Sequence, residues 1–196
     1  MQEKSNLKVS LITLTYNSSN TVRRTLKSIL EQNFQSIEHI IVDGYSSDDT
    51  PSIIEEYKDM SEIEVRIIKQ KPSGIYSALN LGIEIATGDV IGVMHSDDYF
   101  EDRNTLKRVM SGFDESTLGV FGNINIINHN GNVVRMWRDT HNSDARGLWW
   151  MPPHVATYMK KSIFLSYGMY DQSYKISGDY EFFCRMGEKF EFSYTL

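Results

Sequence analysis

The feature that most constrains this fold is a regular alternation of β-rich runs and helical patterns over residues 8–98. Four short apolar runs are separated by turn residues and by segments of helical periodicity. We expect strands at 8–14, 39–42, 65–68 and 90–94. A β-α-β-α-β-α-β order predicts a mainly parallel sheet with helices on both faces, joined by right-handed crossovers. The predicted fold class is therefore α/β.

The helices between these strands are predicted from apolar spacing and from end signals. In the second helix Thr50 is expected as the N-terminal cap, with Pro51 at the first helical position. In the third helix Gly82 indicates close approach to a neighbouring element, and Gly88 is expected to close the helix. The predicted buried faces are, in chain order, Val22, Leu26, Ile29 and Leu30; Ile53, Ile54 and Tyr57; and Ile75, Ala78, Leu79, Gly82, Ile83 and Ala86.

The second half of the chain has a different pattern. The turn residues Asn130-Gly131 predict a hairpin between 121–127 and 133–137. A Trp/Pro segment at 148–153 precedes a short expected strand at 155–158, and helices are expected near Ser162 and Asp179. We interpret the chain as a single domain over 1–196, with a first half (1–98) patterned like nucleotide-binding α/β folds and a mixed second half (99–196).

Composition excludes several classes of protein. The 20 basic and 26 acidic residues give a net charge of -6, which argues against a nucleic-acid-binding domain. No apolar run of 18 residues is present, so no transmembrane segment is expected. A single cysteine, Cys184, excludes an internal disulfide framework, and we expect its side chain in the core. These features predict a cytoplasmic globular domain.

Polar residues follow three of the four predicted parallel strands. The first strand ends at Thr15-Tyr16-Asn17, the second at Asp43 and the fourth at Asp97-Asp98. In open α/β sheets ligands bind beyond the carboxyl ends of the strands, so these residues predict a site at one edge. Adjacent carboxylates suit Mg²⁺ or Mn²⁺, although an Asp-Asp pair is also common in solvated turns. Tyr16 could stack on a base and Asp43 could accept a base N–H, or they could pack at the sheet edge and cap a loop.

Other motifs narrow the choice of chemistry. The chain has no G-x-G-x-x-G after the first strand, no P-loop and no G-x-S-x-G element. The histidines show no tight metal-ligand spacing in sequence, but His154 follows Pro152-Pro153, and a rigid turn there could direct its ring toward a pocket. Asp179 stands at an apparent helix start, where a carboxylate is either an N-terminal cap or a functional group.

Taken together, the motifs resemble glycosyltransferase family 2, whose members have the GT-A fold. The similarity covers about residues 7 to 187, with the motifs in the family's order. Three positions depart from the family pattern: Tyr45 stands at a normally small position, His95 replaces the first Asp of a fuller D-x-D-D, and Gly178 replaces the usual Glu. The matching segments are VSLITLTYN at 9–17, IIVDGYSSD at 40–48, GIYSALNLG at 74–82, ATGD at 86–89, HSDD at 95–98 and SGDYE at 177–181.

The resemblance implies a role for each matching residue. Thr15, Tyr16 and Asn17 would line the nucleotide site, and Asp43 would contact the base. Gly74 and Asn80 would border the diphosphate and sugar of the donor. Asp98 would be the principal ligand of a divalent metal, Mn²⁺ or Mg²⁺, while Asp97 would contact ribose or donor sugar, and Asp179 would be the general base. The relatives often continue beyond this point into acceptor-binding or membrane-associated segments, so we expect a truncated catalytic domain.

The resemblance also implies the reaction, an inverting transfer from a nucleoside-diphosphate sugar to an acceptor hydroxyl, as in surface polysaccharide synthesis. A UDP-sugar is the first choice of donor, with dTDP and GDP open, and the acceptor is a saccharide or a lipid-linked molecule at the inner face of a membrane. Trp149, Trp150 and His154 could form an acceptor platform, or the tryptophans could be core residues. Two alternatives remain: a sugar nucleotidyltransferase, whose usual Gly- and basic-rich first loop is absent, and an inactive sugar-nucleotide-binding module.

Overall fold

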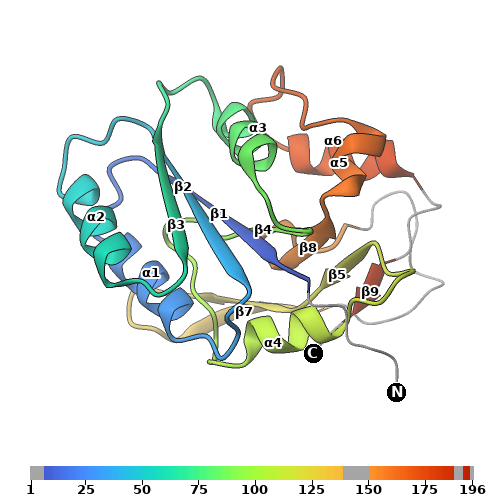
Figure 1. Ribbon diagram of the computed structural model, residues 1–196, viewed down its shortest axis with the longest axis horizontal. Helices are drawn as coiled ribbons and strands as arrows, with labels where there is room; N and C mark the ends of the chain where they lie inside the picture. The colour runs from blue at the N-terminus through green and yellow to red at the C-terminus, as the bar shows by residue number, and fades with distance from the viewer. Residues whose placement is uncertain (1–6, 139–150, 188–191, 195–196) are drawn as a thin grey trace.

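The computed structural model describes residues 7–138, 151–187 and 192–194 (Figure 1). The alternating order predicted for the first half is confirmed. Each predicted strand and helix is present, with ends shifted by a few residues at most. In chain order the elements are β1 (Val9–Thr15), α1 (Val22–Leu30), β2 (Ile37–Asp43), α2 (Thr50–Met60), β3 (Glu64–Lys69), α3 (Ile75–Ile85) and β4 (Val90–Val93).

The second half adds strands to the same sheet. Its elements are α4 (Thr105–Ser111), β5 (Gly119–Phe121), β6 (Ile124–Ile127), β7 (Val133–Trp137), η2 (His154–Ala156), β8 (Thr157–Lys160), α5 (Ser162–Tyr167), α6 (Gly178–Met186) and β9 (Phe192–Tyr194). The hairpin is confirmed as β6 and β7, with Gly131 in the left-handed conformation. The predicted strand at 121–127 is in fact two strands, since Phe121 ends β5 in the main sheet.

The main sheet has seven strands in the order β3-β2-β1-β4-β8-β5-β9. Only β8 runs antiparallel to its neighbours, and it inserts between β4 and β5. In β1 and β2, Val9 pairs with Ile37 and Thr15 with Asp43, so these two strands end at the same level. This register brings the polar residues that follow the strands to one edge of the sheet.

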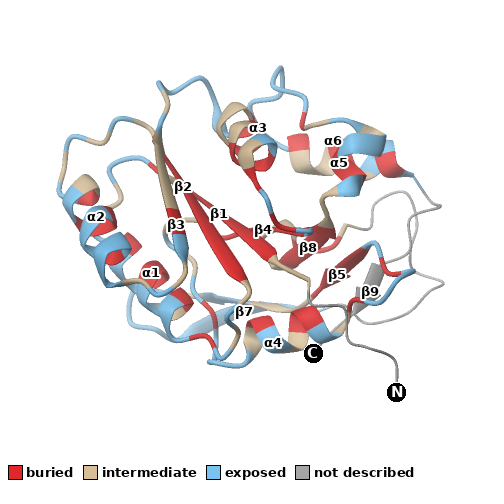
Figure 2. Ribbon diagram, viewed as in Figure 1, coloured by how far each residue is buried: buried red, intermediate tan, exposed pale blue. Residues whose placement is uncertain are grey.

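Helices cover both faces of the sheet, as predicted (Figure 1). On one face α3, α5 and α6 pack over Ile12, Ile40 and Ile91. On the other face α1, α2 and α4 pack over Leu11 and Ile41. The strands between the two helical layers are almost wholly buried at the centre of the sheet (Figure 2). This is the single mixed, mainly parallel α/β arrangement that the alternation predicted.

Several local predictions need correction. Thr50 is the first residue of α2 rather than its cap, and its hydroxyl instead accepts a 2.7 Å hydrogen bond from the Ser18 N–H. Leu30 and Ile75 lie at the exposed edge of their helices, and Cys184 is exposed rather than in the core. The helical period placed these three residues next to buried ones, but each falls just outside the stripe that meets the sheet.

Two glycines mark close approaches of the backbone. A Cβ on Gly82 would lie 2.6 Å from Ile12 Cγ2, so the predicted close contact of α3 with the sheet is confirmed. Gly88 does not close α3, which ends at Ile85. Instead, a Cβ on Gly88 would lie 2.8 Å from the Lys8 carbonyl oxygen, because β4 enters the sheet there.

Two buried polar residues on β2 are fully paired. Glu38 accepts hydrogen bonds from the Ser10 hydroxyl and from the Thr87 and Gly88 N–H groups. Burial alone would raise the pKa of Glu38, but these donors hold it below its usual value. His39 lies between the Tyr57 hydroxyl, 2.8 Å from Nδ1, and the Thr13 hydroxyl, 2.9 Å from Nε2. Burial lowers the pKa of His39 to about 3, so its ring is neutral at pH 7.

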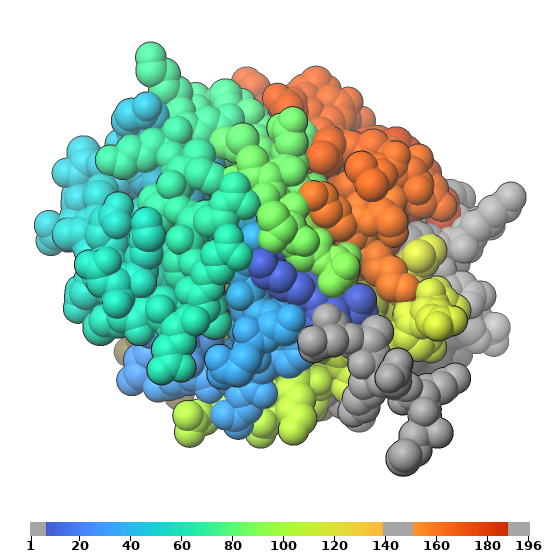
Figure 3. Space-filling view, in the orientation of Figure 1, coloured from blue at the N-terminus to red at the C-terminus, as the bar shows by residue number. Residues whose placement is uncertain are grey.

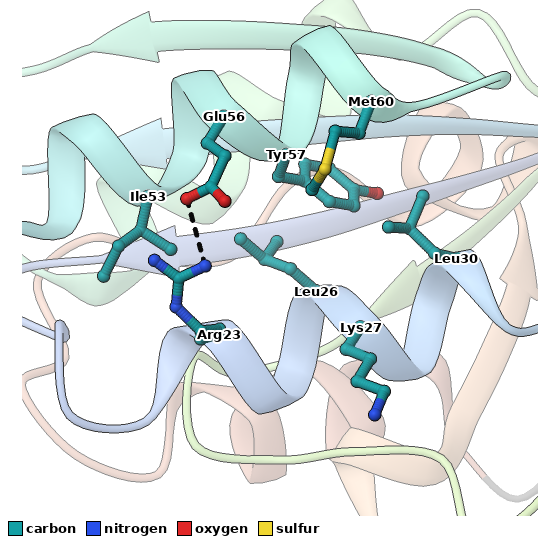
Figure 4. A pocket seen from close by; sticks show the side chains of 8 residues that line it. All are labelled: Arg23, Leu26, Lys27, Leu30, Ile53, Glu56, Tyr57 and Met60. Carbon is teal, nitrogen blue, oxygen red and sulfur yellow. Dashed lines mark hydrogen bonds and ion pairs between the residues drawn. The ribbon is translucent and has the colours of Figure 1, made fainter.

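A groove of about 220 Å³ runs between α1 and α2 (Figure 4). Apolar side chains form most of its lining, and the Arg23–Glu56 ion pair, 3.0 Å long, bridges the two helices. The groove therefore has the character of a helix-packing surface rather than a polar substrate site. It is lined by Arg23, Leu26, Lys27, Leu30, Ile53, Glu56, Tyr57 and Met60.

Candidate active site

A pocket of about 500 Å³ lies beyond the carboxyl ends of β1 and β4. Its position is the one that parallel α/β sheets use for ligands. Four residues singled out from the sequence are in its lining: Thr15, Tyr16, Gly74 and Asp97. The rest of the lining is Leu14, Ser18, Val42, Gly44, Gln70, Lys71, Pro72, Ser73, Ile75, Ala78, His95 and Ser96.

Asp43 lies beneath this pocket and is fully buried. Its carboxylate accepts hydrogen bonds from the Thr15 hydroxyl at 2.9 Å, the Ser46 hydroxyl at 2.6 Å and the Ser46 N–H at 2.9 Å. Asp43 is outside the pocket lining. Asp43 therefore fixes Thr15 and the turn after β2, which is the loop-capping role.

Tyr16 and Asn17 follow β1 directly and differ in what they contact. The Tyr16 ring is 62% exposed at the pocket mouth. Asn17 has a left-handed backbone (φ 49), and its side-chain oxygen accepts a 2.8 Å hydrogen bond from the Ser47 N–H. Asn17 is outside the pocket lining, so it organises the loop, whereas Tyr16 offers a free aromatic face to a ligand.

Gly74 and Asn80 belong to the same sequence motif but lie in different surroundings. Gly74 (φ 108) precedes α3, and a Cβ there would meet open space, so the glycine serves the backbone conformation. Asn80 is buried, and its amide forms hydrogen bonds of 2.8 and 3.0 Å with the carbonyl and N–H of Tyr170. Both functional groups of the Asn80 amide are thus engaged within the protein. This geometry favours a positioning role for Asn80 over the predicted contact with the donor.

Asp97 and Asp98 occupy the turn that follows β4. Asp97 is exposed and faces the pocket, while Asp98 is half-buried. Burial raises the pKa of Asp98, His95 acts to lower it, and the Asp97 charge raises it further. Within the described part of the chain, no lysine or arginine forms an ion pair with Asp98, and no three His, Cys, Asp or Glu side chains group as a metal site.

His95 and His154 meet at this turn, and the sequence did not predict the contact. Their Nε2 atoms are 3.1 Å apart and their ring centroids 5.2 Å apart. Burial, together with the nearby His95, lowers the pKa of His154 to about 4, although Asp179 acts in the opposite direction. The His154 ring is therefore neutral at pH 7. Because His95 lines the pocket, the contact connects the pocket to η2 in the second half of the chain.

Asp179 lies in the first turn of α6, but it is not the helix cap. The N-terminal cap position is held by Ser177, whose backbone is left-handed (φ 63). The Asp179 carboxylate accepts a 3.1 Å hydrogen bond from the Tyr76 hydroxyl, which in turn accepts a 2.7 Å hydrogen bond from the Gly178 N–H. Asp179 is half-buried and close enough to His154 to affect its pKa. The helix-capping alternative for Asp179 is thus removed.

The model of glycosyl transferase family 2 matches residues 10–187 of this sequence. The chain belongs to glycosyl transferase family 2. The match extends from β1 through α6, so it includes the pocket and the Asp179 region together. The recognised motifs are therefore parts of one family domain rather than isolated similarities.

Relatives within this family include glycosyltransferases of several bacteria. The glycosyltransferase EpsH of Bacillus subtilis is 36% identical over 110 residues, which are 56% of this chain and 32% of that protein. A PGL/p-HBAD biosynthesis glycosyltransferase of Mycobacterium bovis is 26% identical over 175 residues, 88% of this chain and 67% of that protein. The matches thus cover between about a third and two thirds of these family 2 relatives.

Solved structures of similar fold are also glycosyltransferases. Staphylococcus aureus TarS has a TM-score of 0.76 and 22% identity, and the match covers 91% of this chain and 55% of that one. A mannosyltransferase from Pyrobaculum calidifontis, solved with GDP-Man and Mn²⁺, has a TM-score of 0.71 and 17% identity and matches 96% of this chain and 56% of that one. These similarities show the GT-A fold, as predicted, and enzymes of this fold typically use a divalent metal ion.

Two further points concern the predicted family 2 site. Trp149 and Trp150, predicted with His154 as an acceptor platform, lie outside the described residues. Among the described helices, none has both the length and the apolar character needed to cross a bilayer. Of the predicted acceptor residues, only His154 thus has a described position, next to the pocket residue His95.

Proposed function

We propose that this protein transfers a sugar from a nucleoside-diphosphate sugar to an acceptor hydroxyl, with inversion at the anomeric carbon. The observation that carries the proposal is a series of neighbouring side chains that leads from the pocket to Asp179. The pocket contains Asp97 and His95, His95 contacts His154, and His154 lies within electrostatic range of Asp179. These contacts support a site in which Asp97 and Asp98 would bind a metal diphosphate and Asp179 would act as the base.

The donor would occupy the pocket with its base at Tyr16. The exposed Tyr16 ring offers a stacking face, and the buried Asp43 would act on the base site by fixing Thr15 in the pocket lining. Gly74 and the N-terminus of α3 border the pocket where a diphosphate would lie, and helix N-termini favour anions. We take a UDP-sugar as the donor; TarS has been solved with UDP and with UDP-GlcNAc, which supports this choice.

A divalent ion would be held at Asp98, with Asp97 beside it. The side chains present fit a divalent ion. Asp98 is a half-buried carboxylate that has no lysine or arginine partner among the described residues. Mg²⁺ commonly binds one or two carboxylates together with substrate phosphates. The lack of a third protein ligand among the described residues agrees with such a shared site. When bound, the ion would neutralise charge on the departing diphosphate.

Asp179 would take the proton from the acceptor hydroxyl as that oxygen attacks the anomeric carbon. The acceptor would approach from the side of η2 and α6, next to His154, so that residues 1–98 bind the donor and residues 99–196 the acceptor. A saccharide or lipid-linked acceptor at the cytoplasmic face of a membrane is part of this proposal.

The test is a calorimetric and thermal-shift screen of UDP, GDP and dTDP, with and without Mn²⁺. A ligand at a hundredfold excess over its dissociation constant should stabilise the fold by about 2.7 kcal/mol. We expect UDP to bind most tightly, to require Mn²⁺ for full affinity, and to lose that requirement in Asp98→Ala. UDP-GlcNAc with Mn²⁺ should then be slowly hydrolysed.

Three results would contradict the proposal. If none of the three nucleotides changed the melting temperature, the pocket would not be a donor site. Binding of UDP-GlcNAc without any metal-dependent hydrolysis would favour an inactive binding module. Release of pyrophosphate from a nucleoside triphosphate and a sugar 1-phosphate would favour a nucleotidyltransferase.

A further inference from the structure

The hydroxyl group of Tyr76 contacts two consecutive residues at the start of α6. It donates to Asp179 Oδ1 at 3.1 Å and accepts from the Gly178 N–H at 2.7 Å. The Tyr76 side chain is only 6% exposed, and it comes from the first turn of α3, about a hundred residues earlier in the chain. One buried hydroxyl thus links the proposed base to the backbone that carries it.

Gly178 provides the space that the Tyr76 ring occupies. A Cβ at position 178 would lie 2.7 Å from Cε2 and 2.8 Å from Cζ of Tyr76, distances that real Cβ atoms do not adopt. The left-handed backbone of Ser177 precedes this glycine. A tyrosine at 76 and any larger residue at 178 are therefore mutually exclusive in this geometry, and the two positions act as a pair.

The Tyr76 ring is held in place by its neighbours. Its centroid is 5.7 Å from that of Tyr170, and the Tyr170 backbone is fixed by both polar groups of Asn80. Asn80 and Tyr76 are both on α3, so this helix binds the segment that leads into α6 at two points. In the space-filling view the green surface around α3 adjoins the orange surface of α5 (Figure 3).

We infer that Tyr76 is a positioning residue for Asp179, fixing the direction of its carboxylate. The inference rests on the proposed function, in which Asp179 is the general base. A general base must be held in a productive direction toward the proton that it takes, so the direction of this carboxylate matters for turnover. Burial and the Asp179 charge raise the pKa of Tyr76, so its hydroxyl keeps its proton and remains a donor over the working pH range.

Other titratable groups face Asp179 from the elements packed against it. His154 faces it from η2, and the His154 ring is neutral at pH 7. Tyr170 faces it from the segment before α6, and burial raises the pKa of Tyr170 far above its usual value. On α6 itself Glu181 is paired with Arg185 at 2.8 Å. Near neutral pH these groups provide no unpaired cation to the Asp179 carboxylate, so the hydrogen bond from Tyr76 fixes its direction.

The decisive measurement is the set of χ1 rotamers of Asp179 in the full chain, obtained from three-bond NMR couplings of ¹³C,¹⁵N-labelled protein and assigned with Asp179→Asn. In the wild type we expect one dominant rotamer, and in Tyr76→Phe we expect the couplings to average over more than one rotamer, because the donor that fixes the carboxylate is lost. Tyr57→Phe is the matched control, because it removes a buried hydroxyl that is bonded to His39 on the other face of the sheet. There the Asp179 couplings should keep their wild-type values.

A second variant reaches the same contact from the opposite side. Gly178→Ala would displace the Tyr76 ring, so the Asp179 couplings should average over rotamers here as well. If Tyr76→Phe does not fold, this variant decides the question. Asp179 couplings that stay at the wild-type values in the folded variants would overturn the inference.

Turnover separates this inference from the proposed function. With UDP-GlcNAc, Mn²⁺ and water as acceptor, Tyr76→Phe should lower kcat by about 10- to 100-fold and leave KM for the donor unchanged. In the Asp179→Asn background the Tyr76→Phe change should have no further effect on kcat. Wild-type protein that never turns over any donor would refute the proposed function, while the rotamer measurement would still decide the Tyr76–Asp179 relationship.

Discussion

The Nε2 atoms of His95 and His154 lie 3.1 Å apart and join the end of β4 to η2. Between two such nitrogens only one proton can lie, so one ring donates and the other accepts. The low pKa of His154 leaves its ring neutral near neutral pH. The contact therefore connects the turn that holds Asp97 to η2, beside Asp179, through a neutral His154 ring.

The two residues proposed at the base should respond differently to truncation. Asp43→Ala should lower the free energy of unfolding by about 1 to 3 kcal/mol, because the buried Thr15 hydroxyl and two half-buried donors of Ser46 lose their acceptor. Tyr16→Ala should leave the melting temperature unchanged, since the ring is 62% exposed. Both changes should weaken UDP binding by about 1 to 3 kcal/mol in calorimetry.

Tyr174→Ala is the control for the exposed ring, because Tyr174 is also exposed but lies outside the pocket lining. It should leave both UDP affinity and melting temperature unchanged. Wild-type UDP affinity in Tyr16→Ala and Asp43→Ala would move the base site elsewhere.

Asp98→Asn should separate stability from metal-dependent binding. It removes a half-buried carboxylate that lies beside Asp97, so in metal-free buffer the melting temperature should stay the same or rise. The affinity for UDP in Mn²⁺ should fall to the value measured without metal. Asp102→Asn, in the same loop but paired with Arg108, is the control and should keep full Mn²⁺-dependent affinity. Retained Mn²⁺ dependence in Asp98→Asn would exclude Asp98 as the principal ligand.

The free energy of unfolding should decrease as the pH falls below about 6.5, before the carboxylates take up protons. Burial lowers the pKa of His39 from its usual 6.5 to about 3 and that of His154 to about 4. Protons therefore bind the unfolded state first. The free energy of unfolding is highest above pH 6.5 and decreases as pH falls toward these values, by about 1.4 kcal/mol per pH unit for each histidine.

Urea unfolding between about pH 7.5 and pH 5 measures this slope, while the stabilising contribution of Glu38 is lost only at lower pH. His39→Asn should be less stable throughout but should show a slope smaller by one proton. A slope that His39→Asn leaves unchanged would mean that His39 is protonated in the folded protein.

The location of the site at one edge of the sheet could be predicted from the sequence, because the topology brings the carboxyl ends of parallel strands together. Parallel strands place their carboxyl ends together, so Thr15, Tyr16 and Asp97 could be assigned to one site from their positions after predicted strands. The family motifs added Gly74, and the structure places these four residues in one pocket lining. The alternating pattern over β1 to β4 also required helices on both faces.

Contacts between the two halves of the chain could not be predicted in this way. The His95–His154 and Tyr76–Asp179 contacts span 59 and 103 positions, and neither residue type nor spacing specifies a partner so distant. Asn80 was assigned to the donor from its motif, although its amide binds the Tyr170 backbone. For Cys184 and Ile75, a helical period of 3.6 gives the centre of a buried stripe but not its edge.

Asp179→Asn remains the substitution that most directly tests the enzyme proposal, and the structure makes its outcome easier to interpret. Since Ser177 holds the cap position of α6, any loss of function cannot be attributed to capping by Asp179. The amide oxygen of Asn can still accept the hydrogen bond from Tyr76, so the melting temperature and UDP affinity should change little.

An amide cannot take a proton from an acceptor, so turnover of UDP-GlcNAc by Asp179→Asn should fall by about 10²- to 10⁴-fold. Glu181→Gln, two residues further along α6 and paired with Arg185, provides the control for removing a carboxylate from this helix. It should retain turnover within a few fold of wild type. If Asp179→Asn turned over the donor as fast as Glu181→Gln, another group would have to accept the proton, and the half-buried carboxylate of Asp179 would be a structural partner of Tyr76 alone.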